Sequence, residues 1–515
     1  MLPILTPEQS AAWDNAAGQA GIALATLMET AGRAVAAVIA ARYPTRLADG
    51  VLIAVGPGHN GGDGWVLARA LHRLGVSVWV TPTPGEGAPL REQMARLARS
   101  DGVREVAPDG PWPRVGILVD ALLGTGASGP PRPPMALLLE RMLDLELPLV
   151  AIDGPTGVDL RTGTVHGTPR AELTVTFGGL RRGHLLARDE VGDVVVVDIG
   201  HPKADPAWPT LVSDPDAAGW LRRLGARDHK GRRGRVVVVG GDVGMTGAVR
   251  MAGRSAFAAG AGLVHAVAPP DTVAALVQAE PDLQTLAQAF DRPLEPTTLD
   301  LVSKADALVI GPGLGREAGR RELVVALARQ ARAVVLDADA LVAFQGSVAE
   351  LRALAADRTV VLTPHPGEFR TLFPALAAER EVDPWAAASR AAEEVAAVVL
   401  LKGVPTVVAS PGTTTLAVAA GNPGLATGGS GDVLSGLIGT ALAQGVAGPA
   451  AAALGAQLLG RAADLAARRV SARGLRPMDV VAALPELWRE WDLLHRAPSP
   501  PRPPILLELT RPQTL

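Results

Sequence analysis

Polar residues follow three short β-branched runs in the first half of this 515-residue chain, at the points where the runs end. Asn60 lies in a glycine-rich segment after the first run, Asp120 ends the second, and Asp153 ends the third. Thr156 follows shortly after Asp153. A single aspartate in such a place is commonly a helix cap or a turn residue. Four polar residues together, at the edge of an open parallel sheet where ligands bind, predict one polar crevice.

Three of these side chains suit a metal ion of a particular kind. Asn60 offers an amide oxygen, Asp120 a carboxylate and Thr156 a hydroxyl, and neither His nor Cys is among them. An all-oxygen set with a single negative charge favours a hard cation of low charge over zinc or iron. The crevice is therefore predicted to hold such a cation.

The glycine-rich segment 56–64 favours an anion, because its backbone N–H groups and a helix N-terminus can face one point. We expect this loop to precede a helix that starts at Trp65. From residue 56 the glycines match the dinucleotide spacing G-x-G-x-x-G. In a dehydrogenase the next strand ends near an acidic residue that holds the ribose, whereas here residues 76–80 run into Thr81-Pro82-Thr83. An ordinary hydride-transferring domain is therefore disfavoured.

The most specific motif of the second half is the glycine-rich cluster 428–431, followed by Asp432. Successive N–H groups at a helix N-terminus can form an anion hole for a phosphate in transfer. Asp432, in the first turn, is placed to accept a proton from a substrate hydroxyl. The alternative is a glycine-rich helix start with Asp432 as its N-cap. His365, between two prolines at a strand end, is likewise either a functional residue or a rigid turn residue.

Two series of apolar, β-branched runs must position these residues, and helical patterns alternate with them. Runs without polar alternation are typical of strands buried on both faces, as in a parallel sheet between helices. Both halves therefore predict the α/β class, a Rossmann-like three-layer fold followed by a second three-layer fold. The expected strands are residues 51–55, 76–80, 115–120, 149–153, 173–177 and 194–198, then 235–239, 263–268, 307–310, 333–337, 359–363, 398–401 and 406–409.

A stretch rich in Pro, Asp and Arg at 200–233 separates the two series, which share no internal period. We place the domain boundary there, with one domain at 1–217 and another at 218–494. The Pro-rich sequence after residue 496 cannot form a core, so 495–515 is expected to be an extended tail.

The composition and the absence of certain motifs exclude several classes of protein. The chain has 49 basic and 52 acidic residues without a basic block, which argues against a nucleic-acid-binding surface. The absence of Cys excludes disulfides, thiolate metal sites and cysteine nucleophiles. No G-x-x-x-x-G-K-[S/T] sequence occurs, so a P-loop NTPase is excluded.

Two features of the sequence bear on whether the chain enters or crosses a membrane. The first residues lack the pattern of a signal peptide, and glycines interrupt the uncharged stretch 433–460. We expect that stretch to form two buried helices that separate near Gly448-Pro449. The interpretation is a soluble cytoplasmic protein without a membrane partner.

The first half resembles NAD(P)H-hydrate epimerase over roughly residues 1–215. The resemblance rests on Gly-x-Gly-x-Asn-Gly-Gly-Asp-Gly at 56–64, Asp-x-x-x-Gly-Thr-Gly-x-x-Gly from Asp120, and Asp-x-Pro-Thr-Gly from Asp153. It implies binding of a hydrated nicotinamide nucleotide and of potassium, and interconversion of the epimers at the hydroxyl-bearing ring carbon. Potassium would lie on Asn60, Asp120 and Thr156.

In this resemblance Asp153 lies beside the substrate ring and is the candidate to take and return a proton. The chain departs from the family at His59, where Asn is usual, at Gly154, where an aliphatic residue is usual, and at Thr156, where Ser is usual. The residues implied to contact the substrate are His59, Asn60, Gly61, Gly62, Asp63, Gly124, Thr125, Gly126, Ala127, Ser128, Gly129, Pro130 and Asp153.

The second half resembles the NAD(P)H-hydrate dehydratase branch of the ribokinase-like superfamily over roughly residues 222–490. The motifs that carry it are His-Lys-Gly from His229, Gly-Met-Thr-Gly-Ala ending at Ala248, Gly-Pro-Gly-Leu-Gly around Gly313, Thr-Pro-His-Pro-Gly-Glu around His365, and Asn-Pro-Gly-x-Ala-Thr-Gly-Gly-x-Gly-Asp ending at Asp432. The branch phosphorylates the misplaced hydroxyl of the S epimer and then eliminates phosphate. In fusions like this chain the donor is ADP and the product AMP.

This second resemblance also implies site residues. The hydrate would contact Ala248, Gly313, His365 and Asp432, with Asp432 as the catalytic base, and magnesium would accompany the nucleotide. The adenine nucleotide would contact Lys402, Gly403, Val404, Pro405, Thr406, Asn422, Thr427, Gly428, Gly429, Ser430 and Gly431.

The sequence thus predicts a bifunctional repair enzyme whose partners are a hydrated coenzyme and an adenine nucleotide. One alternative is a ribokinase-type vitamin-precursor kinase fused to a Rossmann-like binding module. Another is a first half that serves as a non-catalytic interaction module, which the retained Asp120 and Asp153 argue against. The choice of ADP or ATP stays open at this point. Fused sites in α/β layers favour a homo-oligomer.

Overall fold

The computed structural model of the chain describes residues 1–167, 169–496 and 504–514. It divides into two compact units, chiefly Leu2–Trp208 with Pro500–Arg511, and chiefly Pro209–Ser499. The division falls before Pro209, so the expected boundary at 217/218 is placed too late. The reason is that Ala217 and Ala218 are buried in the core of the second unit.

The first unit is a parallel sheet between helices, as expected. Its sheet runs in the order β20-β9-β7-β6-β5-β2-β3-β4. Its elements are β1 (Leu2–Leu5), α1 (Pro7–Gln19), α2 (Leu24–Arg42), η1 (Arg46–Asp49), β2 (Val51–Val55), α3 (His59–Arg73), β3 (Val78–Pro82), α4 (Pro89–Ser100), β4 (Arg104–Glu105), β5 (Ile117–Ala121), α5 (Met135–Leu143), β6 (Leu149–Ile152), β7 (Leu173–Phe177), β8 (Leu180–Arg181), α6 (Arg182–Leu186), α7 (Arg188–Val191), β9 (Asp193–Val197) and β20 (Ile505–Leu509).

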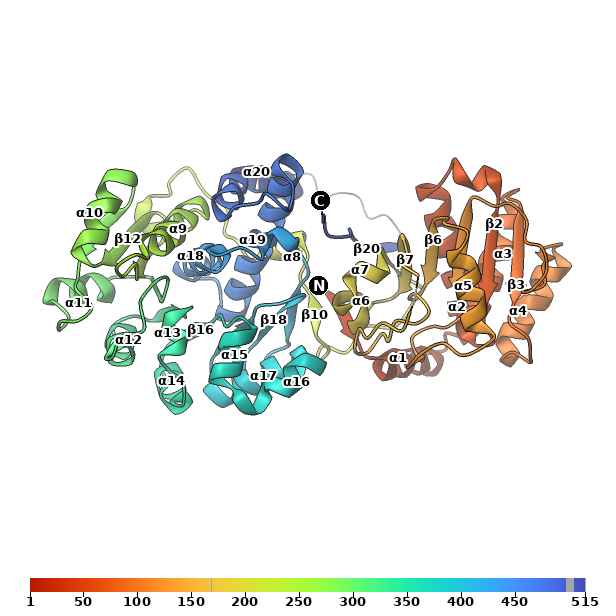
Figure 1. Ribbon diagram of the computed structural model, residues 1–515, viewed down its shortest axis with the longest axis horizontal. Helices are drawn as coiled ribbons and strands as arrows, with labels where there is room; N and C mark the ends of the chain where they lie inside the picture. The colour runs from red at the N-terminus through yellow and green to blue at the C-terminus, as the bar shows by residue number, and fades with distance from the viewer. Residues whose placement is uncertain (168, 497–503, 515) are drawn as a thin grey trace. The chain divides into compact units, whose positions relative to one another are not determined.

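Alternate residues of the central strand β2 serve two hydrophobic cores, one on each face of this sheet. Val51, Ile53 and Val55 pack in a core with α2 and α3, whereas Leu52 and Ala54 pack in a smaller core with α5. Burial on both faces explains why the strands have no polar alternation. Figure 1 labels α2, α3 and α5 with the strands β2, β3 and β6 of this unit.

The glycine-rich segment forms less loop and more helix than expected, because α3 begins at His59 rather than at Trp65. Its glycines mainly allow close packing. A Cβ atom on Gly61 would lie 2.1 Å from the carbonyl oxygen of Gly56, and one on Gly64 would lie 2.7 Å from the Cβ atom of Ala121. The helix N-terminus can therefore approach the ends of β2 and β5 at van der Waals distance.

The second unit is also a sheet covered on both faces, and its strands run in the order β13-β12-β11-β14-β15-β16-β17-β18-β19-β10. Its elements are β10 (Thr210–Leu211), α8 (Asp214–Gly219), η2 (Lys230–Arg233), β11 (Arg235–Val239), α9 (Thr246–Ala258), β12 (Leu263–Ala268), α10 (Pro270–Ala279), β13 (Gln284–Ala287), α11 (Pro296–Ser303), β14 (Ala307–Ile310), α12 (Arg320–Ala328), β15 (Ala333–Leu336), α13 (Asp339–Val342), α14 (Val348–Ala355), β16 (Thr359–Leu362), α15 (Pro366–Leu372), η3 (Pro374–Leu376), α16 (Ala377–Val382), α17 (Pro384–Val395), β17 (Val398–Leu401), β18 (Thr406–Ala409), β19 (Leu416–Val418), η4 (Pro423–Leu425), α18 (Ser430–Ala443), α19 (Gly448–Val470) and α20 (Pro477–Arg496).

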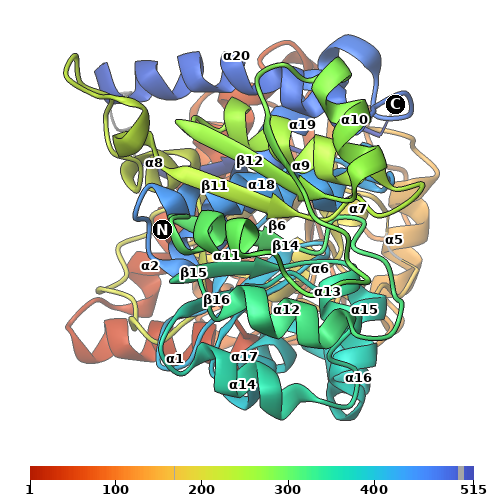
Figure 2. The ribbon, with the colours of Figure 1, turned by 90° about the vertical axis from the view of Figure 1, so that its left-hand side faces the viewer.

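The strands from β13 to β17 are parallel, but β18 pairs antiparallel with both β17 and β19. Only residues 402–405 separate β17 from β18, and so short a connection can only form a hairpin. The sheet lies between α9, α18 and α19 on one face and α12, α14 and α17 on the other (Figure 2). The carboxyl ends of the parallel strands therefore share one edge.

The uncharged stretch forms two helices, as predicted. They are α18 and α19, and almost all of their residues between 433 and 460 are buried. Within the described residues, a single helix, α2, is long and apolar enough to cross a membrane. Half of its apolar window is buried inside the protein, where Leu27, Met28 and Val35 pack in the core of the first unit.

The C-terminal residues form a strand, so the expectation of a tail without structure is wrong for its last part. β20 pairs antiparallel with β9, and Ile505, Leu507 and Leu509 alternate with the more exposed Leu506 and Glu508. This period-2 pattern is what an edge strand requires. The strand is dark blue in Figure 1, beside the yellow strands of the first unit. Residues 497–503, which carry most of the Pro-rich sequence, lie outside the described residues.

Removal of β20 is expected to destabilise the first unit. A chain that ends at Arg496 should show a first unit that melts a few degrees lower, because β9 loses its strand partner and the core loses the packing of the Ile505 side chain against it. Differential scanning calorimetry measures this effect. Leu507→Asp should reproduce it and the outward-facing Leu506→Asp should not; equal effects of the two substitutions would contradict the proposed packing.

Candidate active sites

In the first unit, the ends of β5 and β6 are joined by hydrogen bonds between Asp120 and Thr156. The backbone N–H of Thr156 donates to Asp120 Oδ2 at 2.7 Å, and its hydroxyl donates to Oδ1 at 2.8 Å. The N–H of Leu122 also donates to Oδ1, at 3.1 Å. Asp120 has no exposed surface, and burial raises its pKa despite these three hydrogen bonds. The structure therefore brings together two of the three residues predicted for a cation.

Asn60, the third of these residues, lies in the first turn of α3 and is 8% exposed. Both its Oδ1 and its Nδ2 atoms are buried and have no hydrogen-bond partner within the described residues. An unsatisfied buried amide is costly, and a ligand of this group would remove the cost. The donor chemistry of Asn60, Asp120 and Thr156, all oxygen, fits a hard monovalent cation such as potassium.

Asp153 is held at the end of β6 by four donors. Its Oδ2 accepts from the N–H of Thr125 at 2.8 Å and from the hydroxyl of Thr125. Its Oδ1 accepts from the hydroxyl of Thr176 at 3.0 Å and lies 3.5 Å from the guanidinium of Arg181. Burial acts to raise the pKa of Asp153, but Arg181 and Thr125 outweigh it and lower the pKa below its usual value. Asp153 is thus a carboxylate at neutral pH.

Gly124 brings Asn60 and Asp153 to the same place. A Cβ atom on Gly124 would lie 3.1 Å from the Cβ atom of Asn60 and 3.3 Å from Asp153 Oδ2. Asp63, one helical turn after Asn60, has a pKa well above its usual value because of burial and the charge of Asp153. The cluster therefore combines an ionised carboxylate with a carboxyl group that favours its protonated form.

The remaining predicted substrate residues of this unit fall into two groups. His59, Gly61 and Gly62 lie with Asn60 in the first turn of α3, and His59 is exposed. The loop after β5 contains the others, which are partly or fully exposed: Gly124, Thr125, Gly126, Ala127, Ser128, Gly129 and Pro130. Both groups follow the carboxyl ends of β2 and β5.

Three residues of this site were not identified from the sequence. Thr176 and Arg181 bind the carboxylate of Asp153, and His184 binds its backbone carbonyl. A signal was available for Thr176, because a threonine within the apolar strand β7 is an unpaired polar group unless it finds a partner at the strand end. Arg181 and His184 lie after the strand, and only the fold brings them back to Asp153.

In the second unit, the start of α18 faces Asp337 and Lys402. Gly429, the residue before α18, has φ +100°, which favours glycine. A Cβ atom on Gly431 would lie 3.1 Å from Lys402 Nζ and 3.5 Å from Asp337 Oδ2. The first N–H groups of α18 have no acceptor in their own helix, so this end attracts anions. The position of Lys402 adds a positive charge beside it.

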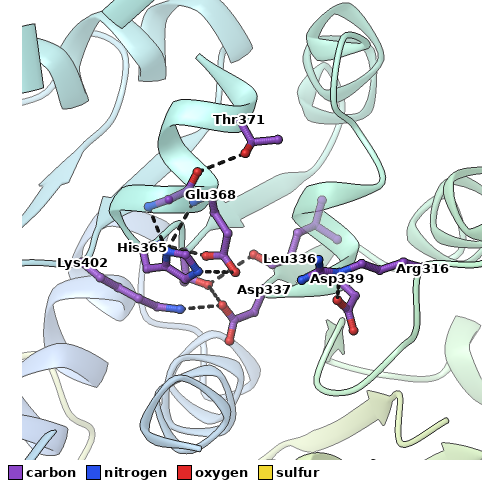
Figure 3. A network of polar contacts seen from close by, with 10 residues as sticks. Arg316, Leu336, Asp337, Asp339, His365, Glu368, Thr371 and Lys402 are labelled. Carbon is purple, nitrogen blue, oxygen red and sulfur yellow. Dashed lines mark hydrogen bonds and ion pairs between the residues drawn. The ribbon is translucent and has the colours of Figure 1, made fainter. Parts of the chain in front are cut away.

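Asp337 anchors Lys402 (Figure 3). Its Oδ1 accepts from Lys402 Nζ at 2.7 Å and from the hydroxyl of Thr363, also at 2.7 Å. Asp337 is 1% exposed, and it was not among the predicted site residues. Asp432 lies in the first turn of α18, where burial and the charges of Asp337 and Asp339 raise its pKa to about 7. A carboxyl group that titrates near neutral pH is suited to accept a proton.

His365 caps the helix α15. It therefore has the structural role of a turn residue, which was one of the two alternatives considered from the sequence. Its Nδ1 accepts from the N–H of Gly367 at 2.9 Å and from that of Glu368 at 3.3 Å, and Glu368 Oε2 accepts from the N–H of His365 at 2.8 Å (Figure 3). The imidazole is still 56% exposed. A second role as a substrate contact is compatible with this arrangement and stays a prediction.

Ala248 and Gly313, which are both predicted to contact the hydrate, lie close together. A Cβ atom on Gly313, at φ +61°, would lie 3.2 Å from the Cβ atom of Ala248. Gly311 permits another close approach, because a Cβ atom there would lie 1.8 Å from the carbonyl oxygen of Asp337. These glycines bring the loop after β14 against the end of β15 and the start of α9.

The predicted nucleotide residues lie in two segments. The first consists of the hairpin turn between β17 and β18 and the first residue of β18, and it contains Lys402, Gly403, Val404, Pro405 and Thr406. The second is the approach to α18, which contains Asn422, Thr427, Gly428, Gly429, Ser430 and Gly431. Within it the side chain of Asn422 is 7% exposed and binds Asp464 and the N–H of Gly424. The buried side chain of Asn422 therefore stabilises the conformation of this segment through hydrogen bonds.

Among the described residues, no three His, Cys, Asp or Glu side chains are grouped so that they could hold a metal ion. Magnesium in the second unit would therefore take most of its ligands from nucleotide phosphates and water, as it commonly does. The carboxylates near the start of α18, Asp337 and Asp432, suit contact with such a hydrated ion.

Both halves match known families. Residues 24–183 match the model described as YjeF-related protein N-terminus, and residues 236–486 match the model described as NAD(P)H-hydrate dehydratase. The bifunctional NAD(P)H-hydrate repair enzyme Nnr of Escherichia coli is 35% identical over 91% of this chain and 90% of its own length. The enzyme of the same name from Pyrobaculum aerophilum is 35% identical over 93% of this chain and 96% of its own.

Solved structures match part of the chain. A ribokinase-like superfamily protein from Enterococcus faecalis covers 55% of this chain and 96% of its own at 24% identity, with a TM-score of 0.47. An ADP/ATP-dependent NAD(P)H-hydrate dehydratase from Bacillus subtilis, co-crystallised with ATP and Mg²⁺, covers 54% of this chain and 97% of its own at 28% identity, with a TM-score of 0.46.

Two α/β units, each with carboxylates at the carboxyl ends of parallel strands, define a two-domain enzyme with one site in each domain. The two alignments with relatives cover nearly the whole of this chain and nearly the whole of each relative. The chain belongs to the family of bifunctional NAD(P)H-hydrate repair enzymes.

Proposed function

We propose that this chain repairs hydrated nicotinamide coenzymes in two steps. The first unit interconverts the R and S epimers of the hydrate, and the second converts the S epimer to NAD(P)H with ADP as phosphoryl donor. The observation that supports this most strongly is the position of Asp432 in the first turn of α18, within the electrostatic influence of the Asp337–Lys402 pair, in a chain that also holds Asp153 near Asn60. One chain thus contains a carboxylate for each reaction.

Asp153 is the proton carrier of the epimerase site in this proposal. The hydroxyl-bearing carbon also bonds the ring nitrogen, so loss of the hydroxyl proton lets the carbon–nitrogen bond open, and closure on the other face gives the second epimer. Asp153 takes the hydroxyl proton and returns it on closure. Its lowered pKa keeps it ionised and ready to do so. The substrate lies along the first turn of α3 and the loop 124–130.

Potassium is held by Asn60, Asp120 and Thr156 in this proposal, and when bound it supplies a fixed positive charge beside the substrate. Asn60 contributes the amide oxygen that lacks a protein partner. Asp120 contributes the charge, and its bonds to Thr156 keep both residues in place.

Replacement of potassium by lithium or choline is expected to slow epimerisation and to leave dehydration of the S epimer unchanged. Epimerisation is measured from the rate at which the R epimer becomes available to an excess of the dehydratase activity. Thr156→Ser keeps the hydroxyl and should keep the potassium dependence, whereas Thr156→Val should lose it. A potassium dependence that is equal in the two variants would exclude this site.

Asp432 is the base of the dehydratase site. It accepts the proton of the substrate hydroxyl as that oxygen bonds the β-phosphorus of ADP, and the bond from this phosphorus to the oxygen shared with AMP breaks. The N–H groups of 428–431 and Lys402 stabilise the charge on the phosphoryl group in transfer. The ring nitrogen lone pair then expels phosphate, which is a far better leaving group than hydroxide, and loss of a proton from the neighbouring ring carbon restores the ring double bond of NAD(P)H. Magnesium neutralises phosphate charge when bound.

The nucleotide is bound by the segments 402–406 and 422–431, and the hydrate by Ala248, Gly313 and His365. Two further properties stay predictions. We expect a homo-oligomer, which light scattering of the purified chain tests, and a cytoplasmic location, which cell fractionation tests.

The whole function is tested with a racemic hydrate mixture. Incubation with ADP and magnesium should regenerate NADH absorbance from both epimers, and ATP in place of ADP tests the choice of donor. A vitamin-precursor kinase would give no NADH absorbance. With a non-catalytic first unit, only the S epimer would give NADH absorbance rapidly. The R epimer would then contribute no faster than it epimerises spontaneously.

A further inference from the structure

The backbone at Asp153 adopts a conformation that only few residues other than glycine adopt. Its φ is +66°, and the N–H of the next residue, Gly154, donates to the carbonyl of Ile152 at 2.8 Å. A hydrogen bond between residues i and i+2 around a positive φ is the pattern of the γ-turn that is rare and strained. Something in the surrounding structure must hold this turn.

His184 binds the backbone of this turn. Its Nε2 lies 2.6 Å from the backbone carbonyl oxygen of Asp153, and its Nδ1 accepts from the N–H of Arg181 at 3.0 Å. Because Nδ1 accepts, Nε2 must carry the proton and donate to Asp153. The ring has no exposed surface. His184 contacts the backbone of Asp153, whereas Thr125, Thr176 and Arg181 bind its carboxylate.

The ring stays neutral in this position. Burial lowers the pKa of His184 to about 4, against the charge of Asp153, and the nearby Arg181 and Arg188 act in the same direction as burial. The hydrogen bond to the turn is thus constant over the physiological pH range, and it supplies a donor to the backbone carbonyl of Asp153.

From this geometry we propose that His184 is a positioning residue of the epimerase site, which holds the γ-turn at Asp153 and thereby aims its carboxylate at Gly124 and Asn60. The proposal rests on the proposed function of Asp153. His184 acts through the backbone and does not touch the substrate. Its loss should lower the rate of the chemical step more than it weakens substrate binding.

Two substitutions separate the two hydrogen bonds of His184. His184→Gln places an amide donor near the position of Nε2, and His184→Asn keeps only an acceptor near the position of Nδ1. We expect His184→Asn to lower kcat for epimerisation by about 10²-fold with little change in KM. His184→Gln should restore most of kcat, and both variants should dehydrate the S epimer normally. Equal kcat values in the two variants, or a change confined to KM, would overturn the proposal.

A second measurement does not depend on any activity. Glycine adopts a positive φ without strain, so the turn needs no support when residue 153 is glycine. His184→Asn should therefore lower the melting temperature of the first unit less in the Asp153→Gly background than in the Asp153→Ala background. Equal losses in the two backgrounds would show that His184 does not hold the turn, whether or not the chain proves to be an epimerase.

Discussion

Asp432→Asn is expected to lower the rate of NADH formation from the S epimer by about 10³-fold, which corresponds to about 4 kcal/mol in the barrier. The substitution keeps the size and the hydrogen-bonding reach of the side chain and removes only its ability to accept the hydroxyl proton. Binding of ADP, measured by isothermal titration calorimetry, should persist, since the glycine-rich segment and Lys402 are unchanged.

The pH dependence of the wild-type enzyme provides a second measure of the same group. Burial and Asp337 raise the pKa of Asp432 to about 7, so its carboxylate form is lost as the pH falls through 7. A base must be ionised, and kcat/KM for dehydration should therefore fall about tenfold per pH unit below this value and level off above it. Asp432→Asn should abolish this inflection.

Asp300→Asn is the matched control for this variant. Asp300 is an exposed aspartate of α11 whose partner is Lys304, and its substitution should leave the rate and the pH profile unchanged. An Asp432→Asn enzyme that keeps more than a tenth of the activity would show that another group accepts the proton.

Asp153→Asn is expected to divide the repair of a racemic mixture into two phases. The S epimer should be consumed at the wild-type rate, and the R epimer should follow only as it epimerises spontaneously. Asparagine tolerates a positive φ better than most residues, so the substitution removes the charge while it keeps the turn. The loss in the epimerisation rate should again be about 10²–10⁴-fold.

The first phase of this reaction is its own control, because dehydration takes place in the other unit of the same polypeptide. A chiral assay of the remaining hydrate should find the R epimer. Complete conversion in a single phase would mean that Asp153 is not the proton carrier. Loss of both phases would point to misfolding, which a melting curve of the first unit detects.

The sequence allowed much of the fold to be predicted, because strands buried on both faces are uniformly apolar. All the runs expected as strands are strands, and Asp120 and Asp153 lie at the shared strand edge where the pattern placed them. The start of α3 was placed too late, since glycines were interpreted as loop residues although they serve close packing at Gly61 and Gly64.

The parts that were missed depend on contacts between distant segments. Asp337 follows an ordinary strand, and its importance is seen only when Lys402 is found 2.7 Å away. His184 is 31 residues from Asp153 in the sequence, and no periodicity connects them. Very short strands such as β10 and β19, with two and three residues, carry too few residues for a pattern, so the fold around them decides their structure.

The place of β20 has a consequence for the order in which the molecule is made. About 300 residues separate Val197 at the end of β9 from Ile505, and a ribosome needs about 15–60 s to translate them. During that interval the newly made first domain presents an unpaired strand edge to other nascent chains and to chaperones. The half of the protein that emerges first is therefore completed only after all the strands of the second unit have been made.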